Sequence, residues 1–314
     1  MKIVVFGLGA IGTVFATSLK QAGETVYGIT KEKYIEKIKN QTLEIRGLFG
    51  EKKAKLDNIF TNPEQIQDGD LDLIIVSVKA YDTETVIKQI KPLIGKDTFV
   101  LLAQNGYGNY EIASSIIEKE KIILSRIIFG AKLVDIGVAE VTVFADDIVI
   151  GQPDNLISEE KLSEVAKVFN NAGLPTRVSQ KVYSILWDKI IYNSALNPLG
   201  AILECNYGTL AEYEETRKIM NKIVEEIFNV AKLSKIRLNW TDYRDYLKYF
   251  YEKLVPPTAK HFPSMYYDVK NGKRTEIDAF NGAIVKLAKQ CGLEVPVNET
   301  ITNLLKIKEN LILR

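Results

Sequence analysis

The chain has few of the side chains that most often bind metals or form disulfides. Its 314 residues include two cysteines, Cys205 and Cys291, and one histidine, His261. A tetrahedral zinc site of cysteine and histidine would need several carboxylates in addition, so we expect no metal site. Acid–base chemistry built on histidine would depend on His261 alone. Both cysteines are expected to be reduced thiols in a core or on a helix surface.

The chain also lacks long apolar runs and an excess of either charge. No apolar run reaches the roughly 18 residues that span a bilayer, and the first residues, MKIVVFGLG, show no signal-peptide layout. The formal net charge of +1 gives no electrostatic reason to expect nucleic acid or an anionic membrane as partner. We therefore expect a cytoplasmic globular protein, long enough for two domains.

The first half of the chain alternates short apolar runs with amphipathic stretches. This alternation predicts βαβ units around a parallel sheet, and the near-continuous Val, Ile and Leu predict strands buried on both faces. The expected strands are 2–7, 25–30, 71–78, 98–103 and 121–131, and the expected helices are 10–22, 31–40, 82–93 and 107–117.

The pattern changes after about residue 130. Residues 137–152 predict an antiparallel strand–turn–strand pair at the far side of the sheet, followed by a helix at 158–172 and a short strand at PTRVS. Helical periodicity then dominates in segments 181–203, 208–232, 241–254, 276–291 and 297–311. We expect a doubly wound α/β domain at 1–179 and an all-helical domain at 180–314.

A glycine-rich loop follows the first expected strand. VVFGLGAIGTVFA has the spacing G-x-G-x-x-G at the start of a helix. In this layout the first glycine permits a tight turn, the second lets the backbone approach a pyrophosphate, and the third permits close helix–strand packing. The helix N-terminus adds N–H groups and partial positive charge. The position ahead of further βα units predicts a Rossmann-type dinucleotide site formed by Gly7, Leu8, Gly9, Ala10, Ile11 and Gly12.

Other strand ends bear on the choice of nucleotide. A site that prefers NAD usually has an acidic residue after the second strand, whereas YGITKEK has Thr30 and Lys31 there. A cation suits a 2′-phosphate, so NADP (NADPH) is predicted over NAD; alternatively, Lys31 is an ordinary exposed residue. Lys79 and Asn105 follow two further strands, where ligands of open α/β sheets collect. Taken alone, Asn-Gly is also ordinary turn chemistry and Lys79 an ordinary loop lysine.

The segment LWDKIIYNSALNPLGAIL is apolar except for a regular polar series. Lys189, Asn193 and Asn197 stand four residues apart, so they form one stripe on a helix. Burial lowers the pKa of a lysine, which makes Lys189 a plausible proton donor. The alternative is a lysine that extends to water and amides that bind local backbone. Pro198 predicts a kink.

A second polar segment, KHFPSMYYDVKNGKRTEIDAFNGAIV, strengthens the functional interpretation. Ser264 begins a short stretch before the NGKR turn. TEIDAFNGAIV predicts a new helix with Glu276 in its first turn, where the helix dipole stabilises a carboxylate. Glu276 would then be available to pair with Lys189.

With both segments in view, the chain resembles the ketopantoate reductase (2-dehydropantoate 2-reductase) family over essentially its whole length. The similar motifs are GLGAIG, SVKAYD, QNGYGN, WDKIIYNSALNPLGAI and PSMYYDVKNGKRTEIDAFNGAI; the last two together are specific. The resemblance implies reduction of 2-dehydropantoate to (R)-pantoate by NADPH in pantothenate and coenzyme A synthesis.

The resemblance also implies roles for individual residues. Lys189 matches the general acid, and Glu276 matches the carboxylate that binds a substrate hydroxyl and interacts with that lysine. The substrate contacts match Asn193, Asn197 and Ser264. Asn105 matches a residue that bridges cofactor and substrate, Lys79 a lysine near the cofactor, and Lys31 the basic residue at the 2′-phosphate. PSM departs from the SSM of many members. The substrate is expected to lie in the cleft between the domains.

Three alternatives stay open or are excluded at this stage. A reductase of the same family acting on another 2-oxo acid is the nearest alternative. A non-catalytic NADP-binding regulatory protein is the second, and the set of Lys189, Asn193, Asn197, Ser264 and Glu276 argues against it, because a sensor needs no proton donor. Short-chain dehydrogenase chemistry, for which Tyr249 and Lys253 offer a Y-x-x-x-K pair, is excluded because that superfamily's glycine spacing is absent. DYRDYLKYFYEKL is a candidate homodimer face, or its tyrosines pack over their own domain.

Overall fold

The computed structural model describes residues 1–39, 42–67 and 69–313. The chain divides into two compact units, Met1–Asn105 with Asn109–Tyr183 and Gly106–Gly108 with Ser184–Arg314. The division falls inside the helix Val182–Leu203, and the short loop Gly106–Gly108 belongs to the unit formed by the second half of the chain.

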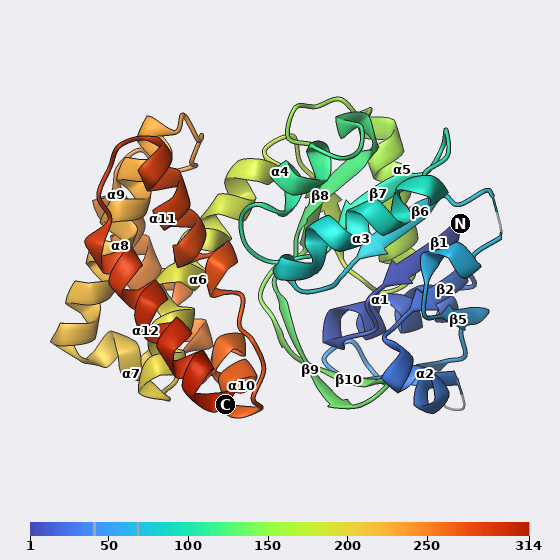
Figure 1. Cartoon of the computed structure of the whole chain (residues 1–314), viewed down its shortest axis with the longest axis horizontal. Helices are drawn as coiled ribbons and strands as arrows, with labels where there is room; N and C mark the ends of the chain where they lie inside the picture. The colour runs from blue at the N-terminus through green and yellow to red at the C-terminus, as the bar shows by residue number, and fades with distance from the viewer. Residues whose placement is uncertain (40–41, 68, 314) are drawn as a thin grey trace. The chain divides into compact units, whose positions relative to one another are not determined.

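The first unit is built on a mostly parallel sheet (Figure 1). Among the described residues its strands are β1 (Lys2–Phe6), β2 (Thr25–Ile29), β5 (Asn58–Phe60), β6 (Leu73–Val76), β7 (Phe99–Leu102), β8 (Ile122–Arg126), β11 (Ile148–Gly151) and β12 (Thr176–Val178). Their order is β12-β11-β8-β7-β6-β1-β2-β5, and only the β8–β11 pair is antiparallel. The predicted doubly wound α/β architecture is confirmed.

Helices and short turns connect these strands. The helices are α1 (Ala10–Gln21), α2 (Glu32–Lys39), α3 (Thr83–Ile90), α4 (Asn109–Ser114) and α5 (Glu159–Asn171), with 3₁₀ turns at Pro63–Gln65, Ala80–Asp82, Lys91–Leu93 and Lys119–Lys121. The expected helix at 107–117 is therefore shorter than predicted. The expected strand at 121–131 is two strands, because the chain leaves the main sheet after Arg126 and enters another sheet at Phe129.

That other sheet was not predicted. It has the order β4-β3-β10-β9, formed by β3 (Leu43–Gly47), β4 (Lys52–Ala54), β9 (Phe129–Asp135) and β10 (Val138–Phe144). The predicted pair at 137–152 is wrong, because β10 pairs with β9 and β3 whereas β11 pairs with β8 and β12. The physical reason is burial: β11 is buried at every position, as the main sheet requires, and β10 alternates along much of its length.

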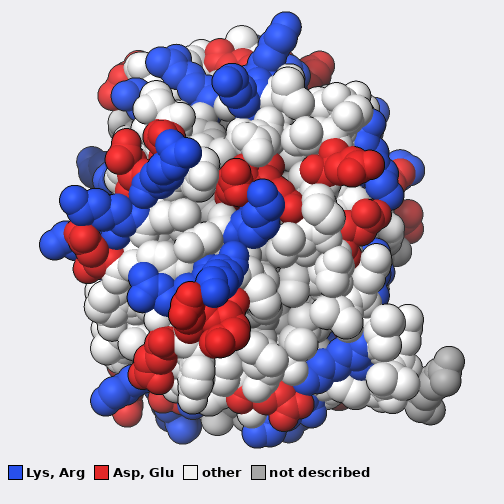
Figure 2. Space-filling view, turned by 90° about the vertical axis from the view of Figure 1, so that its left-hand side faces the viewer, with Lys and Arg blue, Asp and Glu red and all other residues white. Residues whose placement is uncertain are grey.

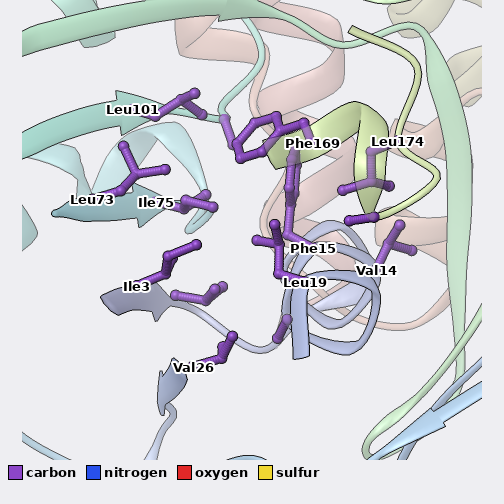
Figure 3. Close-up of a cluster of buried hydrophobic side chains, with 14 of the residues drawn as sticks. Ile3, Val14, Phe15, Leu19, Val26, Leu73, Ile75, Leu101, Phe169 and Leu174 are labelled. Carbon is purple, nitrogen blue, oxygen red and sulfur yellow. The ribbon is translucent and has the colours of Figure 1, made fainter. Parts of the chain in front are cut away.

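The second sheet explains why α1 is buried almost all round. Every residue from Gly12 to Leu19 is buried, because α1 contacts both β2 of the main sheet and β3 and β10 of the second sheet. Phe15 lies at the centre, with its ring centroid 5.3 Å from that of Phe169 on α5 (Figure 3). Strand side chains such as Ile75 complete this cluster. The helix that begins at the glycine loop is thus held rigidly.

Among its described residues the second unit consists of helices and loops without a strand, as predicted. Its helices are α6 (Val182–Leu203), α7 (Tyr207–Glu212), α8 (Glu214–Leu233), α9 (Tyr243–Tyr249), α10 (Ser264–Lys270), α11 (Asn281–Gln290) and α12 (Pro296–Ile312), with a π-helical turn at Phe250–Leu254 and 3₁₀ turns at Pro256–Thr258 and Ile277–Ala279. Two predicted boundaries are wrong. The segment 208–232 is two helices with a break at Tyr213, and in the segment 276–291 the α-helix begins only at Asn281.

The tyrosine-rich segment mostly packs inside its own unit. Tyr246 and Phe250 are fully buried, and the Tyr251 ring receives the guanidinium of Arg217 at 4.4 Å from its centroid. Tyr249 is exposed and stacks near Trp240. On the face of the molecule that Figure 2 shows, Lys and Arg are interspersed with Asp and Glu. Homodimer formation stays a prediction.

Residues 1–39, 42–67 and 69–313 contain neither a helix fit to cross a membrane nor a cluster of metal-binding side chains. None of their helices combines the length and the apolar character that crossing a membrane requires. No group of three or more His, Cys, Asp or Glu side chains in that part of the chain is arranged to hold a metal ion.

Candidate active site

The glycine loop after β1 has three glycines in three different environments. Gly7 has a φ of +101°, and its N–H donates to the Ile29 carbonyl at 2.9 Å. A Cβ at Gly7 would lie 2.8 Å from Cγ1 of Val78. Both the left-handed backbone and the close neighbour therefore require glycine at this turn.

Gly9 and Gly12 differ in the space around them. A Cβ at Gly12 would collide with the Gly7 carbonyl oxygen and lie 2.6 Å from Oγ of Ser77, whereas a Cβ at Gly9 would meet no atom within 4 Å. The Ser77 hydroxyl donates to the Gly7 carbonyl at 2.8 Å and ties the loop to the end of β6. The loop is thus closed toward the sheet and open at Gly9.

The start of α1 is suited to an anion. Gly9 is the N-cap residue, no side chain caps this end, and no acidic residue lies in the first turn. The first N–H groups of a helix have no partner inside the helix and carry partial positive charge, so Ala10 and Ile11 contribute backbone donors. Leu8 instead packs into the core against Gly28 of β2. This open, uncapped loop fits the pyrophosphate of a dinucleotide.

The two residues directly after β2, Thr30 and Lys31, are not acidic. Thr30 is buried, and its N–H donates to the Phe60 carbonyl at 3.0 Å. Lys31 is exposed and immediately precedes α2, which begins at Glu32. A cation is therefore placed beyond β2, as the sequence predicted, with Glu32 beside it.

A buried hydrogen-bond chain joins the loops after β6 and β7. Nε2 of Gln104 donates to the Val78 carbonyl at 3.0 Å and to Oγ1 of Thr83 at 2.7 Å. Thr83 donates to Oδ1 of Asn109 at 2.7 Å, and Nδ2 of Asn109 donates to the Asn105 carbonyl at 2.9 Å. The chain fixes the loop that carries Lys79 against the loop that carries Asn105.

This arrangement is only partly predictable from the sequence. Gln104 and Asn109 are the first and last residues of the QNGYGN motif after β7, whereas Thr83 lies outside the motifs. Thr83 and Asn109 are both buried polar residues beyond strand ends, and buried polar side chains need partners. That rule was the available signal.

Directly after Asn105 the chain makes close contacts within the second unit. The N–H of Tyr107 donates to the Ala279 carbonyl at 2.8 Å, and the ring centroids of Tyr107 and Trp187 are 5.3 Å apart. Gly106 has a φ of +87°, and a Cβ there would lie 2.6 Å from Cβ of Ala279. Trp187 lies on the same helix as Lys189, and Ala279 follows Glu276 in the same segment, so this loop contacts the two elements that carry the predicted catalytic residues.

The predicted polar stripe lies on α6, which is one continuous helix. Lys189 and Asn193 are half-buried, and Asn197 is 4% exposed. Oδ1 of Asn197 accepts a hydrogen bond from the Tyr207 hydroxyl, which belongs to the first residue of α7. The stripe thus has two half-buried side chains followed by one that is buried.

Pro198 lies inside α6, and the hydrogen bond that it removes is replaced. A helical residue at 198 would donate its N–H to the carbonyl of Ser194, but proline has no N–H. Nδ2 of Asn281 donates to that carbonyl at 3.1 Å and also to Oδ1 of Asn298 at 3.0 Å. Asn298 in turn donates to Glu226 at 2.8 Å. The sequence did not predict this support, which is buried throughout.

Ser264 and Glu276 lie on segments that pack against the end of α6. Ser264 is exposed at the first position of α10, after Pro263. A Cβ at Gly200 would lie 2.8 Å from Cγ of Pro263, so the helix needs glycine where this segment crosses it. Residues of α6, α10, α12 and the Ile277–Ala279 turn form one hydrophobic cluster.

The predicted position of Glu276 in the first turn of an α-helix is wrong. Glu276 is buried and precedes the 3₁₀ turn Ile277–Ala279, whereas α11 begins only at Asn281. It therefore does not lie in the first turn of an α-helix, and the predicted helix-dipole effect on its carboxylate does not apply. The neighbouring Thr275 N–H donates to Oε1 of Glu309 at 2.7 Å, which fixes the segment on α12.

A glycine loop of the dinucleotide-binding type in the first unit and a lysine–amide stripe in the second point to an oxidoreductase that uses a pyridine nucleotide. Comparison with known families agrees. The family described as "Ketopantoate reductase PanE/ApbA" matches residues 3–155, and "Ketopantoate reductase PanE/ApbA C terminal" matches residues 181–309. The chain belongs to the ketopantoate reductase PanE/ApbA family, whose members are pyridine-nucleotide-dependent oxidoreductases.

Individual relatives cover the whole chain. It is 48% identical to the 2-dehydropantoate 2-reductase of Aquifex aeolicus over 98% of this chain and 97% of that protein. It is 34% identical to the 2-dehydropantoate 2-reductase of Pyrococcus horikoshii over 99% of this chain and 98% of that protein.

Solved structures show the same fold. A PanE/ApbA family ketopantoate reductase from Ralstonia eutropha covers 100% of both chains with a TM-score of 0.87 and 26% identity. A D-mandelate dehydrogenase solved with NADH and anilino(oxo)acetate covers 99% of both chains with a TM-score of 0.86 and 30% identity. The second protein is named for another 2-hydroxy acid, so the fold alone does not decide the substrate.

Proposed function

We propose that this protein reduces 2-dehydropantoate to (R)-pantoate with NADPH, as a cytoplasmic step of pantothenate and coenzyme A synthesis. The observation that carries the proposal is the full-length, 48% identity to a 2-dehydropantoate 2-reductase. The polar stripe of α6 supports it, because an ammonium and two amides on one helix face suit a substrate that has a carboxylate, a ketone and a hydroxyl.

The nucleotide would be held by the first unit. The loop from Gly7 to Gly12 would receive the pyrophosphate at the N-terminus of α1, and Lys31 would pair with a 2′-phosphate. Lys79 and Asn105 would contact the cofactor from the loops after β6 and β7. When bound, the reduced nicotinamide supplies the hydride that adds to the C2 carbon of the 2-oxo acid.

Lys189 would complete the reduction. As C2 becomes tetrahedral, negative charge develops on the ketone oxygen, and the Nζ of Lys189 donates a proton to it. The product is the 2-hydroxy acid, and Lys189 is left neutral until solvent returns the proton. Glu276 would hold the substrate hydroxyl and Lys189, and Asn105 would bridge cofactor and substrate. The side chains of Asn193, Asn197 and Ser264 would orient the substrate.

A substrate panel tests this proposal. We expect NADPH oxidation with 2-dehydropantoate at a kcat/KM of about 10⁴ M⁻¹ s⁻¹ or more, a usual value for an enzyme with its own substrate. Other 2-oxo acids should give values at least about tenfold lower. NADPH binding without oxidation by any 2-oxo acid would contradict the proposal and favour a regulatory protein.

The second candidate function is reduction of an aromatic 2-oxo acid with NADH. Its support is the 30% identical D-mandelate dehydrogenase, which was solved with NADH. The panel therefore includes the 2-oxo acid that corresponds to mandelate, with both nucleotides. A higher kcat/KM for that acid with NADH than for 2-dehydropantoate with NADPH would favour the second candidate.

A further inference from the structure

The amide of Asn197 is constrained by a buried hydroxyl. Tyr207 is 4% exposed and its hydroxyl donates to Oδ1 of Asn197, which is itself 4% exposed. Burial raises the pKa of Tyr207 well above its ordinary value, so the hydroxyl keeps its proton at physiological pH. A neutral phenol that donates must find an acceptor, and the amide oxygen is that acceptor.

This hydrogen bond determines which part of the amide is available to a ligand. An Asn side chain has one oxygen acceptor and two N–H donors. With Oδ1 engaged by Tyr207, Asn197 offers a ligand its Nδ2 donors. Such donors match oxygen acceptors, which a 2-oxo acid has in its carboxylate and in its ketone.

Tyr207 is in turn held on several sides. Its N–H donates to the His261 carbonyl at 3.1 Å, and the next N–H, of Gly208, donates to the Ala259 carbonyl at 2.8 Å. Its ring centroid lies 5.3 Å from that of His261 and 5.8 Å from that of Tyr192. The hydroxyl is therefore fixed relative to Asn197 and to the segment that leads to Ser264.

We propose that Tyr207 is a positioning residue that orients the Asn197 amide so that Nδ2 donates to an oxygen of the 2-oxo acid. This inference rests on the proposed function, in which Asn197 contacts the substrate. Tyr207 acts through Asn197 and makes no contact with the substrate itself. Its role is to make Asn197 specific for an acceptor oxygen.

Tyr192 offers a matched control. It lies beside Tyr207 and is also largely buried, but its hydroxyl bonds to Oγ1 of Thr258 at 2.5 Å. Tyr192→Phe and Tyr207→Phe each remove one buried hydroxyl from the same aromatic group, and only Tyr207→Phe removes the partner of Asn197.

The experiment is steady-state kinetics with 2-dehydropantoate and NADPH in a double-mutant cycle. We expect Tyr207→Phe to raise KM for 2-dehydropantoate about tenfold with kcat changed less than about threefold, because one orienting hydrogen bond is lost. In the Asn197→Ala background, Tyr207→Phe should change KM less than about twofold. Tyr192→Phe should leave KM within about twofold of wild type in both backgrounds.

A further variant keeps the test independent of folding. Asn197→Asp retains an oxygen acceptor for Tyr207 and loses the Nδ2 donors, so it should raise KM for 2-dehydropantoate at least about tenfold. Because Asn197 is buried, thermal unfolding of Asn197→Asp is measured as well, and KM is compared at a temperature at which each variant is folded. Thermal unfolding of Tyr207→Phe, measured in parallel, separates loss of fold from loss of orientation.

The outcomes that overturn the proposal are distinct from failure of the proposed function. An unchanged KM in Tyr207→Phe, or an equal rise in the Asn197→Ala background, shows that Tyr207 does not act through Asn197. An unchanged KM in Asn197→Asp shows that Nδ2 does not bind the substrate. Wild-type protein that reduces no 2-oxo acid would instead refute the proposed function, and the role of Tyr207 with it.

Discussion

The strongest stability prediction concerns Asn281, which replaces the helical hydrogen bond that Pro198 removes from α6. Nδ2 of Asn281 donates to the Ser194 carbonyl and to Oδ1 of Asn298, and all of these groups are buried. The perturbation is Asn281→Ala, which deletes both donors and adds none. We expect a large loss of stability, because two acceptors are left in the interior without these donors.

The magnitude follows from those two acceptors. Leaving a buried polar group unsatisfied costs about 1–3 kcal/mol. Oδ1 of Asn281 has no hydrogen-bond partner among the described residues, so truncation sacrifices no acceptor bond there. We therefore expect Asn281→Ala to lower the free energy of unfolding by about 3 kcal/mol, including the small cavity that it creates.

The assay is urea denaturation, with Pro198→Ala as the second background. Alanine at 198 restores an N–H that can donate to the Ser194 carbonyl, so Asn281→Ala should cost about 1–2 kcal/mol less in that background. A cost below about 1 kcal/mol in the wild-type background, or an equal cost in both backgrounds, would refute the reasoning.

Three further predictions concern the nucleotide loop, cofactor choice and the single histidine. Gly9→Ala should leave thermal stability unchanged but weaken NADPH binding about tenfold or more, because the added Cβ enters the open side of the loop. Gly12→Ala should weaken NADPH binding and also lower thermal stability, because the added Cβ collides with Gly7. Lys31→Ala should raise KM for NADPH about tenfold and leave KM for NADH unchanged, whereas the neighbouring Lys33→Ala should change neither; equal effects on both nucleotides would count against a 2′-phosphate contact. Burial lowers the pKa of His261 below its ordinary value of 6.5, so the unfolded chain takes up a proton first and stability should fall as pH drops below roughly 6.5. Because the chain has one histidine, a proton NMR titration reports it directly, and a midpoint at or above 6.5 would contradict the prediction.

The sequence predicted the elements whose signal is local. Continuous apolar runs such as those of β6 and β7 gave strands buried on both faces, and the G-x-G-x-x-G loop gave the start of α1. The four-residue spacing of Lys189, Asn193 and Asn197 gave one stripe on one helix, which α6 confirms. In each case the signal lies in residues that are close together in the sequence.

Long-range pairing was not predictable in the same way. Strand β3 contains Glu44 and Arg46, and β4 contains two lysines, so neither has the apolar signature of a core strand. One of the two partners of β10 is β3, which is nearly a hundred residues away in sequence, and no local pattern in 137–152 indicates that pairing. Tertiary contacts decide such a choice.

The supports of the candidate site were hidden for a related reason. In the sequence Tyr207 is one of many tyrosines, and Asn281 lies inside the expected helix 276–291. Tyr207 acts on a residue of the preceding helix and Asn281 on a residue 87 positions away, so neither contact has a local signature. Pro198 alone indicates that the Ser194 carbonyl lacks its helical N–H donor. It does not indicate which side chain donates to that carbonyl instead. Glu276 shows the opposite error, in which a local helix pattern placed the helix start too early.

The most direct test of the account is the effect of Lys189→Met on the reduction of 2-dehydropantoate by NADPH. Lys181→Met, which removes an exposed lysine just before α6, is the matched control. We predict that Lys189→Met lowers kcat about 10²–10⁴-fold, as expected for loss of a general acid, while the control stays near wild type. A Lys189→Met enzyme with wild-type kcat and wild-type pH dependence would contradict the role assigned to the α6 stripe.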